Sequence, residues 1–371
     1  MSKIVIASFE IPGVFSEAEA ASQLTRAIRT HDRSYENGDI VQLPLVDGGE
    51  GTIDFLVTNT LGSFLEVETT DAKGIDTVVP IGFTGEDGKL AVIEMKRAAE
   101  VMSVGEHGTT YGIGELIRDA LDEGAFSVLL GLDEPIASDG GLSIAAALGV
   151  KFLDAKGRTL EMNAADPPIS KIARVDASGR SFELLSSRFF IGVTRAASQT
   201  TPSKALLTQL DRLSEIILRD CEIHASTQGL TASAAAFGLR AFLGAEVQDG
   251  RALVLEAAQA EKAIFESPAL LIIANDLEQL EEENAKKLIR SANEMGKQIT
   301  VVLAGHSAIK EGEECLYSAD SVFSLADVTL FQPPVPPNAG LEERRRDTIM
   351  RIEKIIPKVV ESLQQDSFAK R

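Results

Sequence analysis

Tryptophan is absent from the sequence, and aromatic residues make up only 5% of it, although 44% of the residues are hydrophobic. The apolar content is therefore mainly aliphatic, a balance typical of buried parallel strands that helices cover. The only cysteines, Cys221 and Cys315, lie too far apart to predict a disulfide framework or a zinc site, and the 4 histidines show no metal-ligand spacing. The low cysteine content favours a reducing compartment, so we expect a cytoplasmic protein.

Positive charge is scarce as well, because 36 lysines and arginines stand against 56 aspartates and glutamates, for a formal net charge of −20. Such an acidic surface repels nucleic acid and anionic membranes unless it carries a local basic patch, and no such patch is evident in the sequence. No apolar run is long enough to span a bilayer, and residues 2–9 lack the features of a signal peptide. We therefore expect neither a nucleic-acid nor a membrane partner.

Two common catalytic signatures are missing. Neither the G-x-x-x-x-G-K-[ST] phosphate loop nor the G-x-S-x-G nucleophile elbow occurs in the sequence. The chain therefore lacks the usual motifs of P-loop NTPases and of α/β hydrolases.

The pattern of expected strands and helices indicates two domains, as does the length of 371 residues, which exceeds one typical compact core. Strands alternate with helices at both ends of the chain, and residues 269–274 predict a buried parallel strand. The segment from residue 64 onward instead alternates like a hairpin or meander. We predict an α/β fold in which a Rossmann-like domain of residues 1–63 and 260–371 is interrupted by a second, inserted α/β domain of residues 64–259.

The densest glycine cluster lies in residues 43–52, which read LPLVDGGEGT. Residues 39–45 predict a strand, and residues 52–61 repeat apolar residues at helical spacing. Three glycines in four positions let backbone N–H groups approach an anion, and the start of the helix favours negative charge there. The alternative is that these glycines only permit unusual backbone angles in a tight strand-to-helix turn.

A second turn of this kind, residues 133–141 (DEPIASDGG), follows a strand predicted at residues 127–132 and opens a helix of small residues. Two such turns can face one another across a cleft and bind an oxygen-rich small anion, with Mg²⁺ held by Asp47 or Asp139. The residue pattern alone identifies neither the ligand nor the reaction.

Stretches in the same order along nearly the whole chain resemble the bacterial glycerate kinase family. Residues 43–52 are similar to its L-P-[LM]-A-D-G-G-E-G-T almost residue for residue, and residues 109–117 (TTYGIGELI) to its T-T-[YF]-G-[VT]-G-E-L-I. Residues 138–154 resemble the end of its G-G-S-A-T-N-D-G-G-x-G-x-x-x-A-L-G, while residues 238–246 and 319–325 also match. The resemblance implies the family fold, in which one α/β domain is inserted into a Rossmann-like one.

The family activity is the ATP-dependent phosphorylation of glycerate. If the chain is active, the resemblance therefore implies a small hydroxy acid and a nucleotide as ligands, with ATP and Mg²⁺ as cofactors, and no residue is assigned as a metal ligand. It implies catalytic roles for Asp47 and Asp139. The substrate-binding residues that it implies are Gly48, Gly49, Glu50, Gly51, Thr52, Ser138, Gly140 and Gly141.

Several polar motifs of the family are altered in this sequence. Where the family pattern reads P-D-S-F-K-G, residues 7–10 read ASFE, so that Glu10 stands in place of a lysine. Residues 133–141 lose the glycine pair and the hydroxyls of G-G-S-A-T-N-D-G-G, and residues 192–198 (GVTRAAS) lose the Asp and Asn of C-D-V-x-N-P-L. Residues 274–283 (ANDLEQLEEE) replace T-G-E-G-x-x-D-x-Q-T.

Phosphoryl transfer depends on cations and N–H donors around the transferred group, so these changes bear on catalysis. Two hypotheses follow. In the first, the protein is a glycerate kinase, or a relative that acts on another small hydroxy acid. In the second, it is a non-catalytic relative that keeps the fold and binds a small acid or a protein partner.

Overall fold

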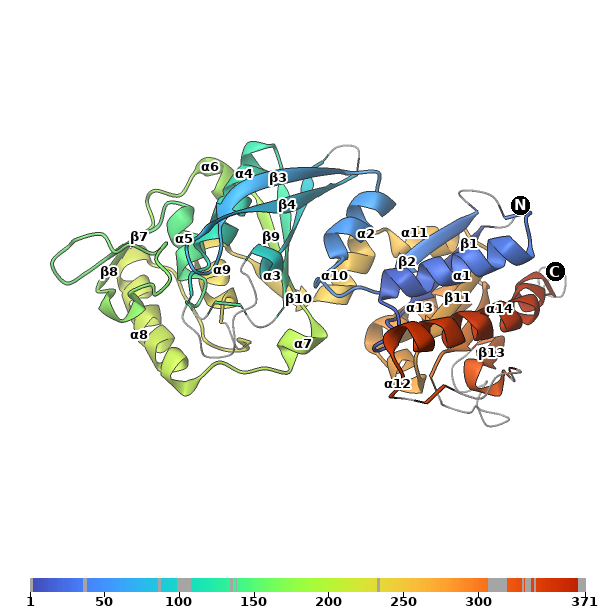
Figure 1. Ribbon diagram of the computed structural model, residues 1–371. Coiled ribbons are helices and arrows are strands. Elements are labelled where there is room, and N and C mark those ends of the chain that lie inside the picture. The colour runs from blue at the N-terminus through green and yellow to red at the C-terminus, as the bar shows by residue number, and fades with distance from the viewer. Residues whose placement is uncertain are drawn as a thin grey trace. The chain divides into compact units, whose positions relative to one another are not determined.

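The computed structural model divides by its internal contacts into two compact units. We call residues 1–46 with 255–371 the terminal unit, and residues 47–254 the middle unit (Figure 1). The described residues are 3–35, 39–85, 88–98, 108–133, 136–137, 139–231, 234–305, 319–328, 330, 335–336 and 338–365.

The terminal unit contains a sheet in which all 5 strands are parallel, in the order β13-β12-β11-β1-β2. Its strands are β1 (Ile4–Ser8), β2 (Ile40–Pro44), β11 (Ala269–Ala274), β12 (Gln298–Leu303) and β13 (Ser321–Ser324). The chain moves outward from β1 to β2 in one direction and from β11 to β13 in the other. The strand order therefore reverses between β1 and β11, as in doubly wound α/β folds.

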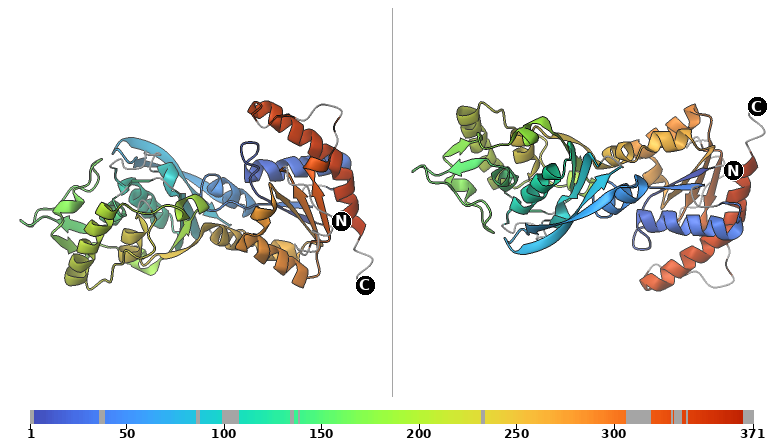
Figure 2. Two further views of the ribbon diagram at one scale, coloured as in Figure 1. Left: turned by 90° about the horizontal axis from the view of Figure 1, so that it is seen from below. Right: turned by 90° about the horizontal axis from the view of Figure 1, so that it is seen from above.

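Helices cover both faces of this sheet. Figure 2 shows α1 (Glu17–His31) and α14 (Leu341–Gln365) on one face, and α11 (Ala260–Phe265) and α13 (Glu283–Glu294) on the other. The short α12 (Leu277–Leu280) follows β11. Continuous aliphatic strands such as β11 (ALLIIA) are buried on both faces, which explains why they carry no alternating pattern.

Local sequence signals account for the start of α1. The Ser16 hydroxyl accepts the Glu19 backbone N–H at 3.3 Å, and the Glu19 carboxylate accepts the Ser16 backbone N–H at 2.9 Å. Such a capping box stabilises a helix start by about 1 kcal/mol. The apolar face of α1, including Leu24 and Ile28, then packs with Ile6 of β1 in the core.

The middle unit contains a mixed sheet of 6 strands in the order β10-β9-β6-β5-β4-β3. Neighbours from β10 to β5 are parallel, whereas β3, β4 and β5 form the predicted antiparallel meander. The strands are β3 (Ser63–Thr70), β4 (Asp76–Thr84), β5 (Leu90–Glu94), β6 (Ser127–Leu132), β9 (Arg188–Val193) and β10 (Glu246–Asp249). A separate pair, β7 (Lys151–Leu153) and β8 (Arg174–Asp176), is antiparallel.

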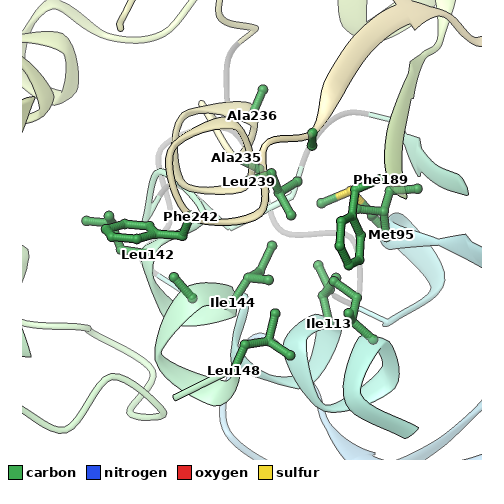
Figure 3. Close-up of a cluster of buried hydrophobic side chains, with 14 of the residues drawn as sticks. Met95, Ile113, Leu142, Ile144, Leu148, Phe189, Ala235, Ala236, Leu239 and Phe242 are labelled. Carbon is green, nitrogen blue, oxygen red and sulfur yellow. The ribbon is translucent and has the colours of Figure 1, made fainter. Parts of the chain in front are cut away.

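The core of the middle unit lies between this sheet and its helices. In Figure 3, Ile144 of α5, Ile113 of α4 and Leu239 of α9 lie within one apolar cluster. The helices of this unit are α2 (Thr52–Asn59), α3 (Met95–Ala98), α4 (Tyr111–Asp122), α5 (Leu142–Ala147), α6 (Phe182–Ser186), α7 (Arg195–Ser198), α8 (Lys204–Cys221), α9 (Ala236–Leu243) and the start of α10 (Gly250–Ala257). Among the described residues, no helix is both long enough and apolar enough to cross a membrane.

The contact-based boundaries differ from the predicted domain boundaries at 63/64 and 259/260. The first lies at 46/47, because α2 packs on β4 and β5 of the middle unit, and the second lies at 254/255. The segment with the glycine turn therefore groups with the middle unit. Independent folding of the two parts stays a prediction.

Candidate functional site

Three polar side chains follow three neighbouring parallel strands of the middle unit. Lys96 comes shortly after β5, Asp133 directly after β6, and Thr194 directly after β9. Neighbouring parallel strands end at one edge of a sheet, and ligands of open α/β sheets bind at the edge where the carboxyl ends lie. This edge of the middle unit is therefore a candidate site.

The glycine turn rests on the same edge through close backbone contacts. A Cβ atom on Gly131 would overlap the carbonyl oxygen of Gly48, and one on Gly250 would overlap the carbonyl oxygen of Asp47. Gly48 has a φ of 97°, and its Cβ would lie 3.2 Å from the carbonyl oxygen of Gly192. Packing alone therefore requires these glycines, whatever the turn binds.

Gly51 also has a structural role, at the start of α2. Gly51 adopts the left-handed conformation, with a φ of 89°, and serves as the N-cap of α2. Glu50 is exposed, whereas Thr52 is buried and its Oγ1 has no hydrogen-bond partner among the described residues. The left-handed backbone at the N-cap of α2 is therefore a sufficient reason for glycine at position 51.

Gly49 differs from the other glycines of the turn, because its φ is not positive. A Cβ there would lie 3.4 Å from Asp47 Oδ1, 3.5 Å from Thr194 Cγ2 and 3.7 Å from Asp133 Oδ2. These are ordinary contact distances, so the backbone tolerates a side chain at this position. Three polar side chains, those of Asp47, Asp133 and Thr194, therefore converge on Gly49.

Asp133 is fixed by two neighbours. Its Oδ2 lies 2.9 Å from Lys96 Nζ, and its Oδ1 accepts a hydrogen bond from Thr194 Oγ1 at 3.1 Å. The buried Thr194 hydroxyl also accepts the Ala197 backbone N–H and so caps α7. The Lys96 side chain is 35% exposed, which leaves its ammonium group accessible to a ligand.

Asp47 is also held by backbone donors. Its Oδ2 accepts the Arg195 backbone N–H at 2.9 Å, and its Oδ1 accepts the Gly49 N–H at 3.4 Å. Asp47 is partly exposed and Arg195 is exposed. The edge therefore presents the carboxylates of Asp47 and Asp133 around Gly49, with the Lys96 ammonium paired to Asp133 and the Arg195 backbone N–H bonded to Asp47.

Glu94, at the end of β5, anchors the helix that follows the turn. Its Oε1 accepts the buried Ile53 backbone N–H at 2.9 Å, and its Oε2 lies 3.7 Å from Arg97 Nη1. Burial raises the pKa of this carboxyl, and the Ile53 N–H and Arg97 lower it by less. Glu94 therefore fixes the start of α2 and, through it, the end of the glycine turn.

Asp139 lies in a different environment, where it is fully buried. Its carboxylate accepts the Thr110 backbone N–H at 2.8 Å, the Thr110 hydroxyl at 2.9 Å and the Gly141 N–H at 2.9 Å. Among the described residues, no hydrogen bond joins Asp139 to Asp47. A catalytic role for Asp139 stays a prediction, and its bonds favour a structural one.

The glycines that follow Asp139 pack against other helices. A Cβ on Gly141 would overlap the carbonyl oxygen of Ala235, and one on Gly140 would lie 2.8 Å from Leu210 Cδ2. Both have positive φ. The described part of this turn thus belongs to the core, and the predicted site residue Ser138 lies outside the described residues.

Lys96, Asp133, Thr194 and Glu94 are not among the site residues predicted from the sequence. A signal was present, because a polar residue follows each of the core strands β5, β6 and β9. The order of those strands in the sheet, which makes them neighbours, could not be derived from the sequence.

The corresponding edge of the terminal unit, where the strand order reverses, is arranged differently. Gln279 Nε2 donates to the carbonyl oxygen of Glu10 at 3.2 Å, and Gln279 Oε1 accepts the Asn275 backbone N–H at 2.7 Å. This residue therefore joins the loop after β1 to the loop after β11. The exposed carboxylate of Glu10 adds negative charge at an edge that would need donors for phosphate.

The described residues contain no group of three or more His, Cys, Asp or Glu side chains that could hold a metal ion. Mg²⁺ in phosphotransferases is usually held by one or two carboxylates together with substrate phosphates. Both carboxylates accept internal donors, but Asp47 is partly exposed and fits such a role, whereas Asp139 is fully buried.

Comparison with known proteins identifies the family. The model of the glycerate kinase family matches residues 4–193, which is about half of the chain. The chain therefore belongs to the glycerate kinase family. A glycerate kinase of Haemophilus influenzae is 36% identical over 181 residues, a match that spans 47% of this chain and 46% of the relative. The glycerate 2-kinase of Escherichia coli is 28% identical over 358 residues, covering 87% of this chain and 90% of the relative.

The fold of the family is confirmed by a solved structure. A crystal structure named for glycerate kinase 2 from Salmonella typhimurium LT2 matches with a TM-score of 0.74 at 23% identity, over 98% of this chain and 99% of that one. The predicted α/β class and the predicted family are thus both confirmed.

Proposed function

We propose that the protein binds a small hydroxy acid beside Gly49, with glycerate as the first candidate, and phosphorylates it with ATP in the cytoplasm. The convergence of Asp47, Asp133 and Thr194 on Gly49 carries this proposal. The names of the relatives supply the candidate substrate and reaction.

The side chains at this edge suit the two ends of a hydroxy acid. Lys96 and Arg195 supply cations for the carboxylate, since charge-assisted hydrogen bonds to carboxylates are strong. Asp47 accepts a hydrogen bond from the substrate hydroxyl and is the candidate general base for its proton. Thr194 and Glu94 position this set without contacting the reacting atoms.

A coupled ADP-release assay with glycerate and related hydroxy acids tests the proposal. Asp47→Asn is expected to lower kcat about 100-fold, because general-base catalysis contributes on the order of 10²–10⁴-fold. Lys96→Ala is expected to raise KM about tenfold with little change in kcat, and Lys156→Ala, on an exposed residue elsewhere, serves as the control. Absence of turnover by folded protein at any substrate concentration would sink the proposal.

The terminal unit favours a second candidate, a non-catalytic protein that binds a small acid. The observation that favours it is the Gln279 bridge beside the exposed Glu10, whose carboxylate repels a triphosphate at this edge. A calorimetric titration with Mg-ATP, alone and with glycerate, separates the candidates. Binding of glycerate without binding of nucleotide supports the second candidate, and ATP-dependent phosphorylation refutes it.

A further inference from the structure

A cavity in the terminal unit is lined by three arginines although the protein is strongly acidic. The cavity, of about 500 Å³, lies between α1 and β2, the edge strand of the sheet. Its charged lining residues are Arg26, Arg29 and Arg33, and no carboxylate lines it among the described residues.

The spacing of these arginines places them together. Residues 26, 29 and 33 follow the i, i+3 and i+7 spacing of one helix face, although α1 itself ends at His31. Arg26 and Arg33 are exposed, and neither forms an ion pair with another residue in the described part of the chain. No consecutive basic run marks the site, which explains why the sequence showed no basic patch.

Uncharged polar groups complete the lining. Gln42 of β2 donates from Nε2 to Thr25 Oγ1 at 2.9 Å, and its Oε1 accepts the Ser22 hydroxyl at 3.3 Å. Thr30 also lines the cavity, and its hydroxyl donates to the Arg26 carbonyl oxygen at 2.8 Å. These hydrogen bonds fix the uncharged polar side chains that lie beside the arginines in the lining.

We propose that this cavity is a binding site for a small anion with two or more charges on phosphate groups. Guanidinium groups bind phosphate oxygens through paired hydrogen bonds, and three of them line one cavity here. A large nucleic acid does not suit the site, because the net charge of −20 opposes it. The helix dipole alone does not account for the cluster, since Arg33 lies beyond the end of α1.

Calorimetric titration of the full chain with inorganic phosphate, inorganic pyrophosphate and glycerol 3-phosphate tests this proposal. Pyrophosphate is expected to bind more tightly than phosphate. The double variant R26A/R33A is expected to weaken pyrophosphate binding at least tenfold, and R26K/R33K by less, because lysine keeps charge but loses the paired geometry. Tighter binding of glycerol 3-phosphate than of either inorganic ion identifies a phosphate ester as the ligand.

Two control variants make the result specific. R290A removes one positive charge from the exposed face of α13, as each of the single variants R26A and R33A does, and is expected to leave pyrophosphate binding unchanged. G49A is expected to lose glycerate binding but keep pyrophosphate binding, so failure of the proposed function and failure of this site give different results. Equal affinity of wild type and R26A/R33A, equal losses in R290A, or no binding of any probe would overturn the proposal. If circular dichroism shows that R26A/R33A is unfolded, the single variants R26Q and R33Q replace it.

Discussion

The two parallel-strand edges in this chain differ in how their loops are held. At the middle-unit edge, the glycine turn rests on the backbones of Gly131 and Gly192, and the side chains of Asp47, Asp133 and Thr194 converge on Gly49. At the terminal-unit edge, Gln279 bridges two loops, and the exposed side chain nearby is the acid Glu10. The proposed ligand site therefore lies at the edge where polar side chains converge on a glycine, and not at the edge where Gln279 bridges the loops.

The largest expected effect concerns the packing of the glycine turn against Gly131 of β6. In Gly131→Ala the new Cβ overlaps the Gly48 carbonyl oxygen, so the turn or the strand must move. We expect a loss of about 3 kcal/mol in the free energy of unfolding, measured by urea denaturation. Gly340→Ala, where a Cβ meets nothing within 4 Å, is the control and is expected to change stability little. Wild-type stability in Gly131→Ala would show that the Gly48 carbonyl oxygen does not pack against Gly131.

The buried turn at Asp139 is expected to respond nearly as strongly. Asp139→Asn places an amide N–H₂ among the N–H and hydroxyl donors of Thr110 and Gly141. We expect a loss of about 2 kcal/mol of stability with glycerate affinity little changed. The matched control is the exposed Asp122→Asn. A large drop in kcat at unchanged stability would instead establish Asp139 as a catalytic residue.

Much of the fold was predictable because its strongest signals are local. The continuous apolar runs at residues 127–132 and 269–274 became β6 and β11, and helix spacing at residues 341–363 became most of α14. The site was harder to predict. The motif at residues 47–52 was evident, but its partners Lys96 and Thr194 are close only because β5, β6 and β9 are neighbours in the sheet.

The role of Asp139 also depends on contacts between residues that are distant in the sequence. A short Asp-Gly-Gly motif before a helix looks equally suited to ligand binding and to packing. The burial of Asp139 against Thr110, and of Gly141 against Ala235, depends on contacts across long stretches of sequence. Those contacts could not be derived from local pattern.

A smaller effect is expected at the terminal-unit edge. Gln279→Ala removes hydrogen bonds to Asn275 and Glu10 that lie partly or fully exposed to solvent. We expect about 1 kcal/mol lower stability by urea denaturation and no gain in Mg-ATP affinity while Glu10 remains. Gln248→Ala, on an exposed glutamine of the middle unit, is the control. Tight Mg-ATP binding by Gln279→Ala would mean that the bridge alone separates the two edges.

The smallest effect is the pH dependence contributed by Glu94. Because burial raises the pKa of Glu94 above its ordinary value of 4.5, the folded protein holds this proton more tightly than the unfolded chain. The resulting stability is present below pH 4.5 and is lost as pH rises through the higher folded pKa. The stability of wild type relative to Glu94→Gln should therefore fall over this range in urea titrations. The exposed Glu123→Gln is the control, and a constant or rising difference would contradict the account.

The most direct test is calorimetric titration of glycerate into wild type and Gly49→Ala. The alanine methyl fits the backbone at ordinary contact distances but fills the space among Asp47, Asp133 and Thr194. We predict that wild type binds glycerate and that Gly49→Ala keeps its melting temperature while its affinity falls at least tenfold. Equal glycerate affinity in the two proteins would contradict the assignment of the ligand site to this edge.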